Sequence, residues 1–193
     1  IRVIPHGVDL PPQPPAAPRR EPIVLHVGAI QKRKNIVRLV QAFESLPAPW
    51  TLVLAGSQGF GAGDIAAAVD ASPARSRIQI RGYVDPLCLE DLYARASLFA
   101  FPSLDEGFGL PVLEAMARGV PVLTSRRSSL PEVAGDAAVL VDPLETEDIA
   151  AGLRRLALDE DELGPVAVGV VAGMKGDGDT RIGANPLELL PEP

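Results

Sequence analysis

The feature that most constrains this chain is a regular alternation of short, nearly continuous apolar runs with longer amphipathic segments, which begins near Ile23. Runs rich in Val, Ile and Leu indicate strands that are buried on both faces, and apolar residues three or four apart indicate helices between them. The order therefore predicts an α/β fold, a Rossmann-like doubly wound parallel sheet. Predicted strands are 23–28, 50–56, 77–82, 97–102, 120–125 and 137–143, and predicted helices are 35–45, 65–71, 89–96, 111–118 and 146–158.

The two ends of the chain differ from this pattern. Residues 11–22, PPQPPAAPRREP, are too rich in proline for a helix or a sheet, so residues 1–22 are predicted to be an interdomain segment and an extended linker. Residues 23–163 form the predicted domain. Residues 164–193 have frequent glycines and no sustained period, which predicts an atypical, poorly ordered tail. The start on IRVIPHGVDL, without an initiator methionine, suggests a piece of a longer protein or a processed product.

Composition limits the possible partners. The net charge of -7 and a pI near 4.9 argue against a nucleic-acid surface, which needs clustered Lys and Arg, although a local basic pocket can still hold one phosphate group. Because Cys88 is the single cysteine, the chain can form neither an internal disulfide nor a cysteine-based zinc site. No cluster of residues has the spacing of metal ligands, so no metal site is predicted.

A glycine-rich turn precedes the predicted helix 111–118. Ligands of a parallel α/β sheet bind in the loops that follow the strands, and helix amino termini favour anions, phosphate above all. The amides of four residues would lie at this helix start, and glycine lets a ligand approach the backbone closely: Gly107, Phe108, Gly109 and Leu110. The alternative is a plain turn between a strand and a helix.

Charged residues lie beside the same predicted edge of the sheet. Lys32, Arg33 and Lys34 follow the first strand, where they could neutralise a diphosphate or could form a solvated face. Glu106 precedes the glycine turn and Glu114 follows it. Glu114 could accept hydrogen bonds from ribose hydroxyls, or it could be a first-turn glutamate that the helix dipole favours.

These motifs together resemble the C-terminal, donor-binding domain of the retaining GT-B glycosyltransferases, the glycosyl transferases group 1 family. The resemblance covers residues 1–163 and rests on IPHGVD (4–9), VGAIQKRKN (27–35), LVLAG (52–56), IRGYV (80–84), FPSLDEGFGLPVLEAMARGVPVLTS (101–125) and SSLPEVAGDAAVLVDP (128–143). It implies that this chain forms the C-terminal half of a GT-B fold. The E-x7-E element made by Glu106 and Glu114 is highly specific for the family.

The resemblance also implies roles for residues. Glu106 would lie near the donor sugar, with Arg33 and Lys34 neutralising the diphosphate, and these three are the expected catalytic residues. Glu114 would hold the ribose. The other expected donor-binding residues are the glycine that ends the first strand, the amides of the turn and the backbone that meets the base: Gly28, Gly107, Phe108, Gly109, Leu110, Tyr83 and Val84.

The implied reaction is transfer of a hexose from a nucleotide diphosphate sugar to a glycan or lipid-linked acceptor, with retention and without a metal. The RKN sequence at 33–35 resembles mannosyl- and rhamnosyl-transferring members, which favours GDP-mannose over a UDP-sugar as donor. Family members often have an arginine where this chain has Ala29. Two alternatives are a non-catalytic nucleotide-sugar binding module or inactive fragment, and a nucleotide-sugar epimerase, against which the E-x7-E element argues.

The family's acceptor domain and its C-terminal crossing helix do not match any part of this sequence. The isolated chain is therefore expected to bind a donor and to be inactive in transfer, with the acceptor held by a missing N-terminal domain. The expected localisation is cytoplasmic, with peripheral attachment to the inner membrane face left open for the full-length protein. No nucleic-acid partner is expected.

Overall fold

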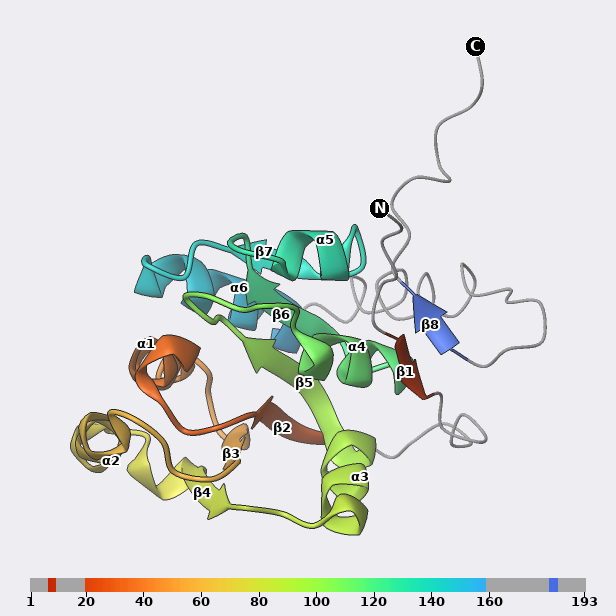
Figure 1. Cartoon of the computed structure of the whole chain (residues 1–193). Helices are drawn as coiled ribbons and strands as arrows, with labels where there is room; N and C mark the ends of the chain where they lie inside the picture. The colour runs from red at the N-terminus through yellow and green to blue at the C-terminus, as the bar shows by residue number, and fades with distance from the viewer. Residues whose placement is uncertain (1–6, 10–19, 159–180, 184–193) are drawn as a thin grey trace.

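A computed structural model of the chain describes residues 7–9, 20–158 and 181–183. Its centre is a six-stranded parallel sheet in the order β4-β3-β2-β5-β6-β7 (Figure 1). The strands are β2 (Glu21–Val27), β3 (Thr51–Ala55), β4 (Ile78–Gly82), β5 (Ala96–Phe101), β6 (Val122–Ser125) and β7 (Val139–Val141). The predicted α/β fold with a doubly wound parallel sheet is confirmed.

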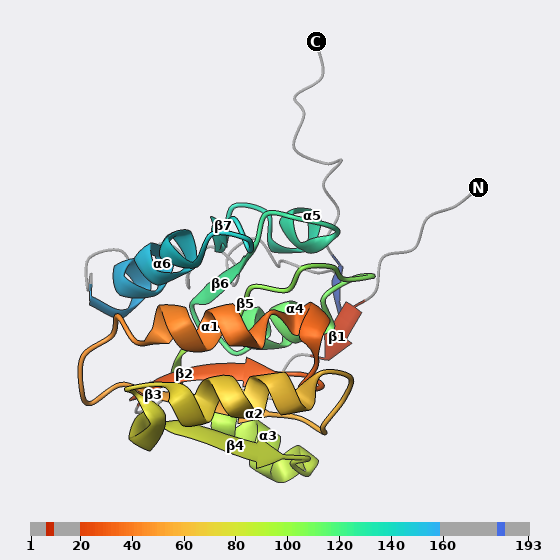
Figure 2. The same cartoon turned by 90° about the vertical axis from the view of Figure 1, so that its left-hand side faces the viewer.

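Helices cover both faces of this sheet. They are α1 (Ile36–Phe43), α2 (Ala62–Ala71), α3 (Pro86–Arg95), α4 (Leu110–Ala117), α5 (Leu130–Ala134) and α6 (Thr146–Leu158), with short 3-10 helices η1 (Lys32–Lys34) and η2 (Arg75–Arg77). Figures 1 and 2 show α1 and α2 on one side of the sheet and α3 and α4 on the other. Each side has its own buried apolar cluster, one shared with α1, α2 and α6 and the other with α3, α4 and α5.

The strand order contains one reversal of direction. The chain runs outward from β2 through β3 to the edge strand β4, and then returns to place β5 on the other side of β2. Open α/β sheets bind ligands beyond the carboxyl ends of the strands at such a switch point. The loops after β2 and β5 therefore flank the position where this fold favours a ligand site.

The predicted elements differ from the observed ones mainly at their ends. Helix α3 begins at Pro86, three residues before the predicted start, because the carboxylate of Asp85 accepts hydrogen bonds from the amides of Leu87 (2.9 Å) and Cys88 (3.0 Å) and so caps the helix. Helix α5 was not predicted. It has only five residues and begins with Leu130 and Pro131, which is too short for a helical period to show in the sequence.

The predicted boundaries of the domain fall partly outside the described residues. Most of the predicted linker (1–22) and tail (164–193) lies outside them, as do residues 159–163 of the predicted domain. Two short strands at these ends were not predicted: β1 (Gly7–Asp9) and β8 (Arg181–Gly183) pair in an antiparallel manner. Strand β2 begins at Glu21, two residues before the predicted start of the domain, so Arg20 and Glu21 belong to the described fold.

Arg20 explains why the fold begins before Ile23. One nitrogen of its guanidinium donates to the carbonyl oxygens of Tyr93 (3.2 Å) and Ala96 (2.6 Å). The other donates to the carbonyls of Arg118 (2.9 Å) and Gly119 (3.0 Å). These carbonyls lie at or just beyond the ends of α3 and α4, where helices leave carbonyl groups without partners. Arg20 thus joins both helix ends to the start of β2.

Replacing Arg20 with alanine is expected to lower the free energy of unfolding by about 2 kcal/mol, because partly buried carbonyl groups lose a charged donor. Urea unfolding followed by circular dichroism measures this change. Arg81→Ala is the matched control, because Arg81 is exposed, and its unfolding midpoint should stay near that of the wild type. Equal midpoints for both variants would contradict the role given to Arg20.

Candidate functional site

Three glycines end adjacent strands at the carboxyl edge of the sheet. Gly28 follows β2, Gly56 follows β3, and Gly82 is the last residue of β4. Their backbones continue the ladder: the amide of Gly28 donates to Ala55 (2.9 Å) and that of Gly56 donates to Gly82 (2.7 Å). All three have positive φ values. These bonds bring the backbones of the three glycines close together at the carboxyl edge.

The loops after β2 and β5 meet through a cluster of three charged side chains, two of which are buried. Lys34 Nζ lies 2.6 Å from one carboxylate oxygen of Glu106, and Arg33 donates to the other oxygen at 2.7 Å. The side chains of Lys34 and Glu106 are each 7% exposed, whereas that of Arg33 is 47% exposed. The structure thus brings together the three residues that were predicted to be catalytic, although Glu106 lies more than 70 positions from Arg33 and Lys34 in the sequence.

Burial and ion pairing shift the pKa values of Lys34 and Glu106 in opposite directions. Burial lowers the pKa of the Lys34 ammonium, although the Glu106 carboxylate acts to raise it. For Glu106, burial acts to raise the pKa, but hydrogen bonds from Lys34 and Arg33 outweigh burial and hold the pKa below its ordinary value. Glu106 is therefore a carboxylate at neutral pH, and a compact positive charge lies beside it.

Asn35 fixes the loop that carries the two cations. Its backbone is left-handed (φ +60°), a conformation that asparagine adopts more readily than most residues, and it links η1 to α1. Its buried side-chain amide donates to the carbonyls of Pro102 (3.1 Å) and Pro143 (2.6 Å). The amide of Leu104 also donates to the carbonyl of Arg33 (2.8 Å). These contacts join the loop after β2 to the loop after β5.

Aromatic rings line the buried side of the cluster. Lys34 Nζ lies 4.4 Å from the centroid of the Phe101 ring, a cation–π contact. Gly28 leaves room for this side chain, since a Cβ atom there would lie 3.4 Å from Lys34 Cε. His26 stacks on Phe101 and donates through Nδ1 to the carbonyl of Ala100 (2.9 Å). Burial lowers the pKa of His26 to about 4, so this histidine is neutral and its role is in packing.

The glycine turn runs from Glu106 to the first residue of α4. Gly109 caps this helix in a left-handed conformation (φ +107°), followed by Leu110 and Pro111 at the first positions of the helix. This arrangement matches the predicted helix start, a position that favours an anion. The Lys34–Glu106 pair lies at the other end of the turn, so cations and helix amides flank the same short segment.

Two serines from the loop after β6 hold this turn in place. The hydroxyl of Ser128 accepts from the amide of Glu106 (3.1 Å), and Ser128 has the left-handed backbone (φ +59°) that brings it there. The hydroxyl of Ser129 lies within hydrogen-bond distance of the carbonyl oxygens of Glu106 (3.1 Å) and Phe108 (2.8 Å). The sequence indicated this loop as a place for ligand chemistry but gave neither serine a role.

Glu114 lies one turn into α4 and does not share the partners of Glu106. One of its carboxylate oxygens accepts a hydrogen bond from the hydroxyl of Tyr93 (2.9 Å), and its side chain is only partly buried. The sequence gave no role to Tyr93. Helical spacing predicts that it is buried, but periodicity cannot show which carboxylate its hydroxyl meets.

Tyr83 and Val84, the residues expected near the base, follow the edge strand β4. The ring of Tyr83 is 77% exposed. Both residues line a cavity of about 550 Å³ together with residues at the start of α3, among them Asp85 and Cys88. The structure therefore places them at the carboxyl edge of the sheet, where β3 and β2 separate β4 from β5.

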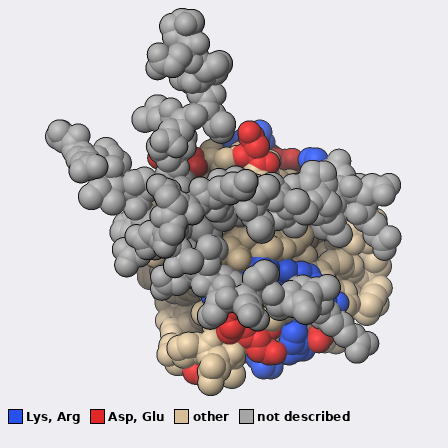
Figure 3. Space-filling model, turned by 90° about the vertical axis from the view of Figure 1, so that its right-hand side faces the viewer, with Lys and Arg blue, Asp and Glu red and all other residues tan. Residues whose placement is uncertain are grey.

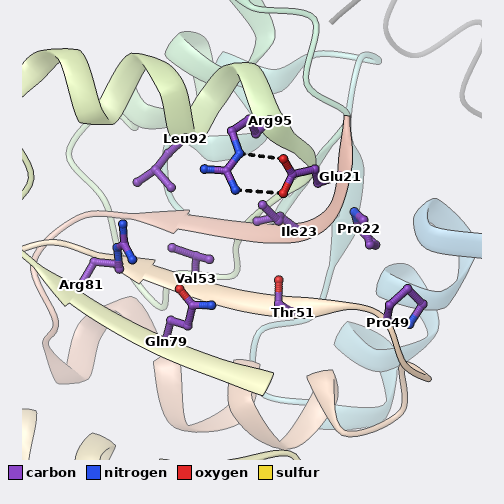
Figure 4. A pocket seen from close by; sticks show the side chains of 10 residues that line it. All are labelled: Glu21, Pro22, Ile23, Pro49, Thr51, Val53, Gln79, Arg81, Leu92 and Arg95. Carbon is purple, nitrogen blue, oxygen red and sulfur yellow. Dashed lines mark hydrogen bonds and ion pairs between the residues drawn. The ribbon is translucent and has the colours of Figure 1, made fainter. Parts of the chain in front are cut away.

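A second cavity lies over the face of the sheet next to α3 (Figure 4). It has a volume of about 240 Å³ and is lined from β2, β3, β4 and α3. Its most polar pair is already satisfied, because Arg95 donates to both carboxylate oxygens of Glu21 (2.8 and 2.9 Å). This cavity is therefore a weaker candidate for a ligand site than the carboxyl edge of the sheet.

Other site classes receive no support from residues 20–158. In this part of the chain no group of three or more His, Cys, Asp or Glu side chains could hold a metal ion. None of its helices combines the length and apolar character that crossing a bilayer requires. On the face that carries α3 and α4, basic and acidic side chains lie next to one another (Figure 3), and on these helices Arg118 pairs with Glu90 (2.7 Å).

Comparisons with known proteins show the family to which this chain belongs. The family described as glycosyl transferases group 1 matches residues 11–164. Over 140 residues the chain is 40% identical to O-antigen chain mannosyltransferase B of Escherichia coli. The aligned region covers 70% of this chain and 37% of that protein. A structure of sucrose-phosphate synthase from Thermosynechococcus elongatus has a TM-score of 0.69 at 32% identity, covering 81% of this chain and 42% of that chain.

HepE of Anabaena, solved in complex with UDP and glucose, superposes with a TM-score of 0.72 at 22% identity, covering 81% of this chain and 44% of that chain. This likeness shows the fold alone. The chain spans less than half the length of each of these proteins. Because the family match extends over most of the sequence, the chain belongs to the glycosyl transferases group 1 family, as the sequence motifs predicted.

Proposed function

We propose that this chain is the donor-binding half of a retaining glycosyltransferase that transfers mannose from GDP-mannose to a glycan or lipid-linked acceptor. The observation that carries the proposal is the buried Lys34–Glu106 pair, with Arg33, at the switch point of the sheet and beside the start of α4. The identity with an O-antigen mannosyltransferase favours mannose. The same fold is found in HepE, whose structure was solved with UDP and glucose.

In the proposed mechanism, the protein stabilises the charge of the leaving nucleoside diphosphate. As the bond between the anomeric carbon and the phosphate oxygen breaks, negative charge develops on the diphosphate. Lys34, Arg33 and the amides at the start of α4 would lie where that charge develops, which favours the transition state over the bound donor. Because fixed cations supply this stabilisation, the proposed reaction requires no metal ion.

The two glutamates have separate proposed roles. Glu106 would face the sugar, and its carboxylate holds the two cations in position before a donor binds. Glu114, one turn into α4 and partly exposed, would accept hydrogen bonds from the ribose hydroxyls. The acceptor would bind outside residues 20–158. This chain alone is therefore expected to bind the donor and to transfer a negligible amount of sugar.

Calorimetric titration with GDP-mannose, GDP, UDP-glucose and UDP tests the proposed function. We expect the chain to bind the guanine nucleotides in preference to the uracil nucleotides, with or without EDTA. Glu114→Ala should weaken binding at least tenfold, because two ribose hydroxyls lose a charged acceptor. Glu132→Ala, a first-turn glutamate of α5, is the matched control and should bind as the wild type does.

Two outcomes would contradict the proposal. A chain with a cooperative unfolding transition that binds none of the four nucleotides would exclude a donor site in this half of the protein. Preferential binding of UDP-glucose would keep the donor site and refute the assignment of GDP-mannose.

A further inference from the structure

The inference concerns Tyr93, a residue of α3 that reaches the proposed ribose site on α4. Tyr93 is 1% exposed, and its hydroxyl donates to Glu114 Oε2 at 2.9 Å. Within residues 20–158, the Tyr93 hydroxyl is the side-chain group that the structure shows hydrogen-bonded to the Glu114 carboxylate. Because a hydroxyl has one proton to donate, the bond fixes one oxygen of the carboxylate and leaves Oε1 for another donor.

An aromatic ring and a guanidinium group lie close to the ring of Tyr93. Its ring centroid lies 5.9 Å from that of Phe99, which in turn lies 5.8 Å from Phe101 beneath Lys34. The Arg118 guanidinium lies 5.0 Å from the centroid of the Tyr93 ring and also donates to the carbonyl oxygen of Glu114 (2.9 Å). A row of aromatic rings therefore connects the carboxylate of Glu114 to the ammonium of Lys34.

The hydroxyl remains a donor under ordinary conditions. Burial raises the pKa of Tyr93, and the negative charge of Glu114 raises it further. The phenol of Tyr93 therefore keeps its proton at neutral pH. A neutral phenol beside a carboxylate limits the orientations of the carboxylate without neutralising its charge.

We propose that Tyr93 is a positioning residue that orients Glu114, and thereby sets the preference of the site for ribose over 2′-deoxyribose. This inference rests on the proposed function, in which Glu114 binds the ribose. A carboxylate that is free to rotate can adapt to a sugar that lacks one hydroxyl, whereas a fixed carboxylate leaves an acceptor unsatisfied when that hydroxyl is absent. Leaving a polar group unpaired costs more than losing a flexible contact.

The test compares GDP with 2′-deoxy-GDP in calorimetric titrations of the wild type and Tyr93→Phe. We expect the wild type to prefer GDP by at least tenfold, and Tyr93→Phe to reduce this preference to about threefold or less. Phe43→Leu is the control for packing, because Phe43 is fully buried in the apolar cluster on the other face of the sheet from Tyr93. It should lower stability more than Tyr93→Phe does and keep the wild-type preference.

The outcomes separate this inference from the proposed function. If the wild type binds GDP in preference to 2′-deoxy-GDP and Tyr93→Phe keeps the full preference, the role of Tyr93 is refuted while the donor site stands. Equal losses of preference in Tyr93→Phe and Phe43→Leu would also refute it, because a general loss of core packing would then explain the effect. If the wild type binds neither nucleotide, the proposed function fails and this inference fails with it.

Discussion

Lys34→Ala is expected to weaken binding of GDP by about 100-fold, the largest effect on ligand binding that the structure predicts. The ammonium of Lys34 is buried and already placed beside the carboxylate of Glu106, so little ordering is needed when a diphosphate binds. Charge-assisted contacts of this kind are each worth about 1.5–3 kcal/mol, and a loss of about 2.7 kcal/mol corresponds to 100-fold. Calorimetric titration with GDP measures this loss.

The chain contains a matched control two residues away. Lys32 belongs to the same 3-10 helix, but its side chain is 68% exposed and pairs with the equally exposed Asp64 at 3.5 Å. Exposed pairs contribute little, so Lys32→Ala should change GDP affinity less than about twofold. If the two alanine variants bind GDP equally well, the diphosphate does not lie on Lys34 and the proposed site is wrong.

Gly56→Ala is expected to lower the free energy of unfolding by about 4 kcal/mol, the largest effect on stability that the structure predicts. A Cβ atom at this position would lie 1.9 Å from the carbonyl oxygen of Gly28, which is backbone and cannot turn away. The φ of +152° adds strain for any other residue. Steric displacement and backbone strain each cost about 1–3 kcal/mol, and together they approach the total stability of many domains.

Gly63→Ala is expected to raise the free energy of unfolding, in contrast to Gly56→Ala. Gly63 lies in α2, and no atom lies within 4 Å of the position that its Cβ would take. Alanine favours helix more than glycine does, so this variant should be more stable than the wild type by about 0.5–1 kcal/mol. Urea unfolding curves of both variants test the pair. A Gly56→Ala variant with the wild-type midpoint would mean that β2 and β3 do not approach each other as the structure shows.

The sequence predicted the fold well because the signals of this fold are local. Buried parallel strands are continuous apolar runs, and the helices between them have their own period, so each element can be recognised within about ten residues. The ends of the helices and strands were less predictable. The cap by Asp85, which moves the start of α3, is a side-chain contact that a hydrophobic period does not contain.

Glu106, Glu114 and the glycine turn were recognised from their spacing along one segment. The sequence by itself therefore determined the order of the six central strands and the five longer helices, the turn before α4 and the family. Only the tertiary structure decided that Lys34 is buried against Glu106 while Lys32 is exposed to solvent, and that Tyr93 meets Glu114. The physical reason is that these contacts depend on which strands are neighbours. The return of the chain that places β5 beside β2 brings together residues 72 positions apart, and no local period in the sequence records that step.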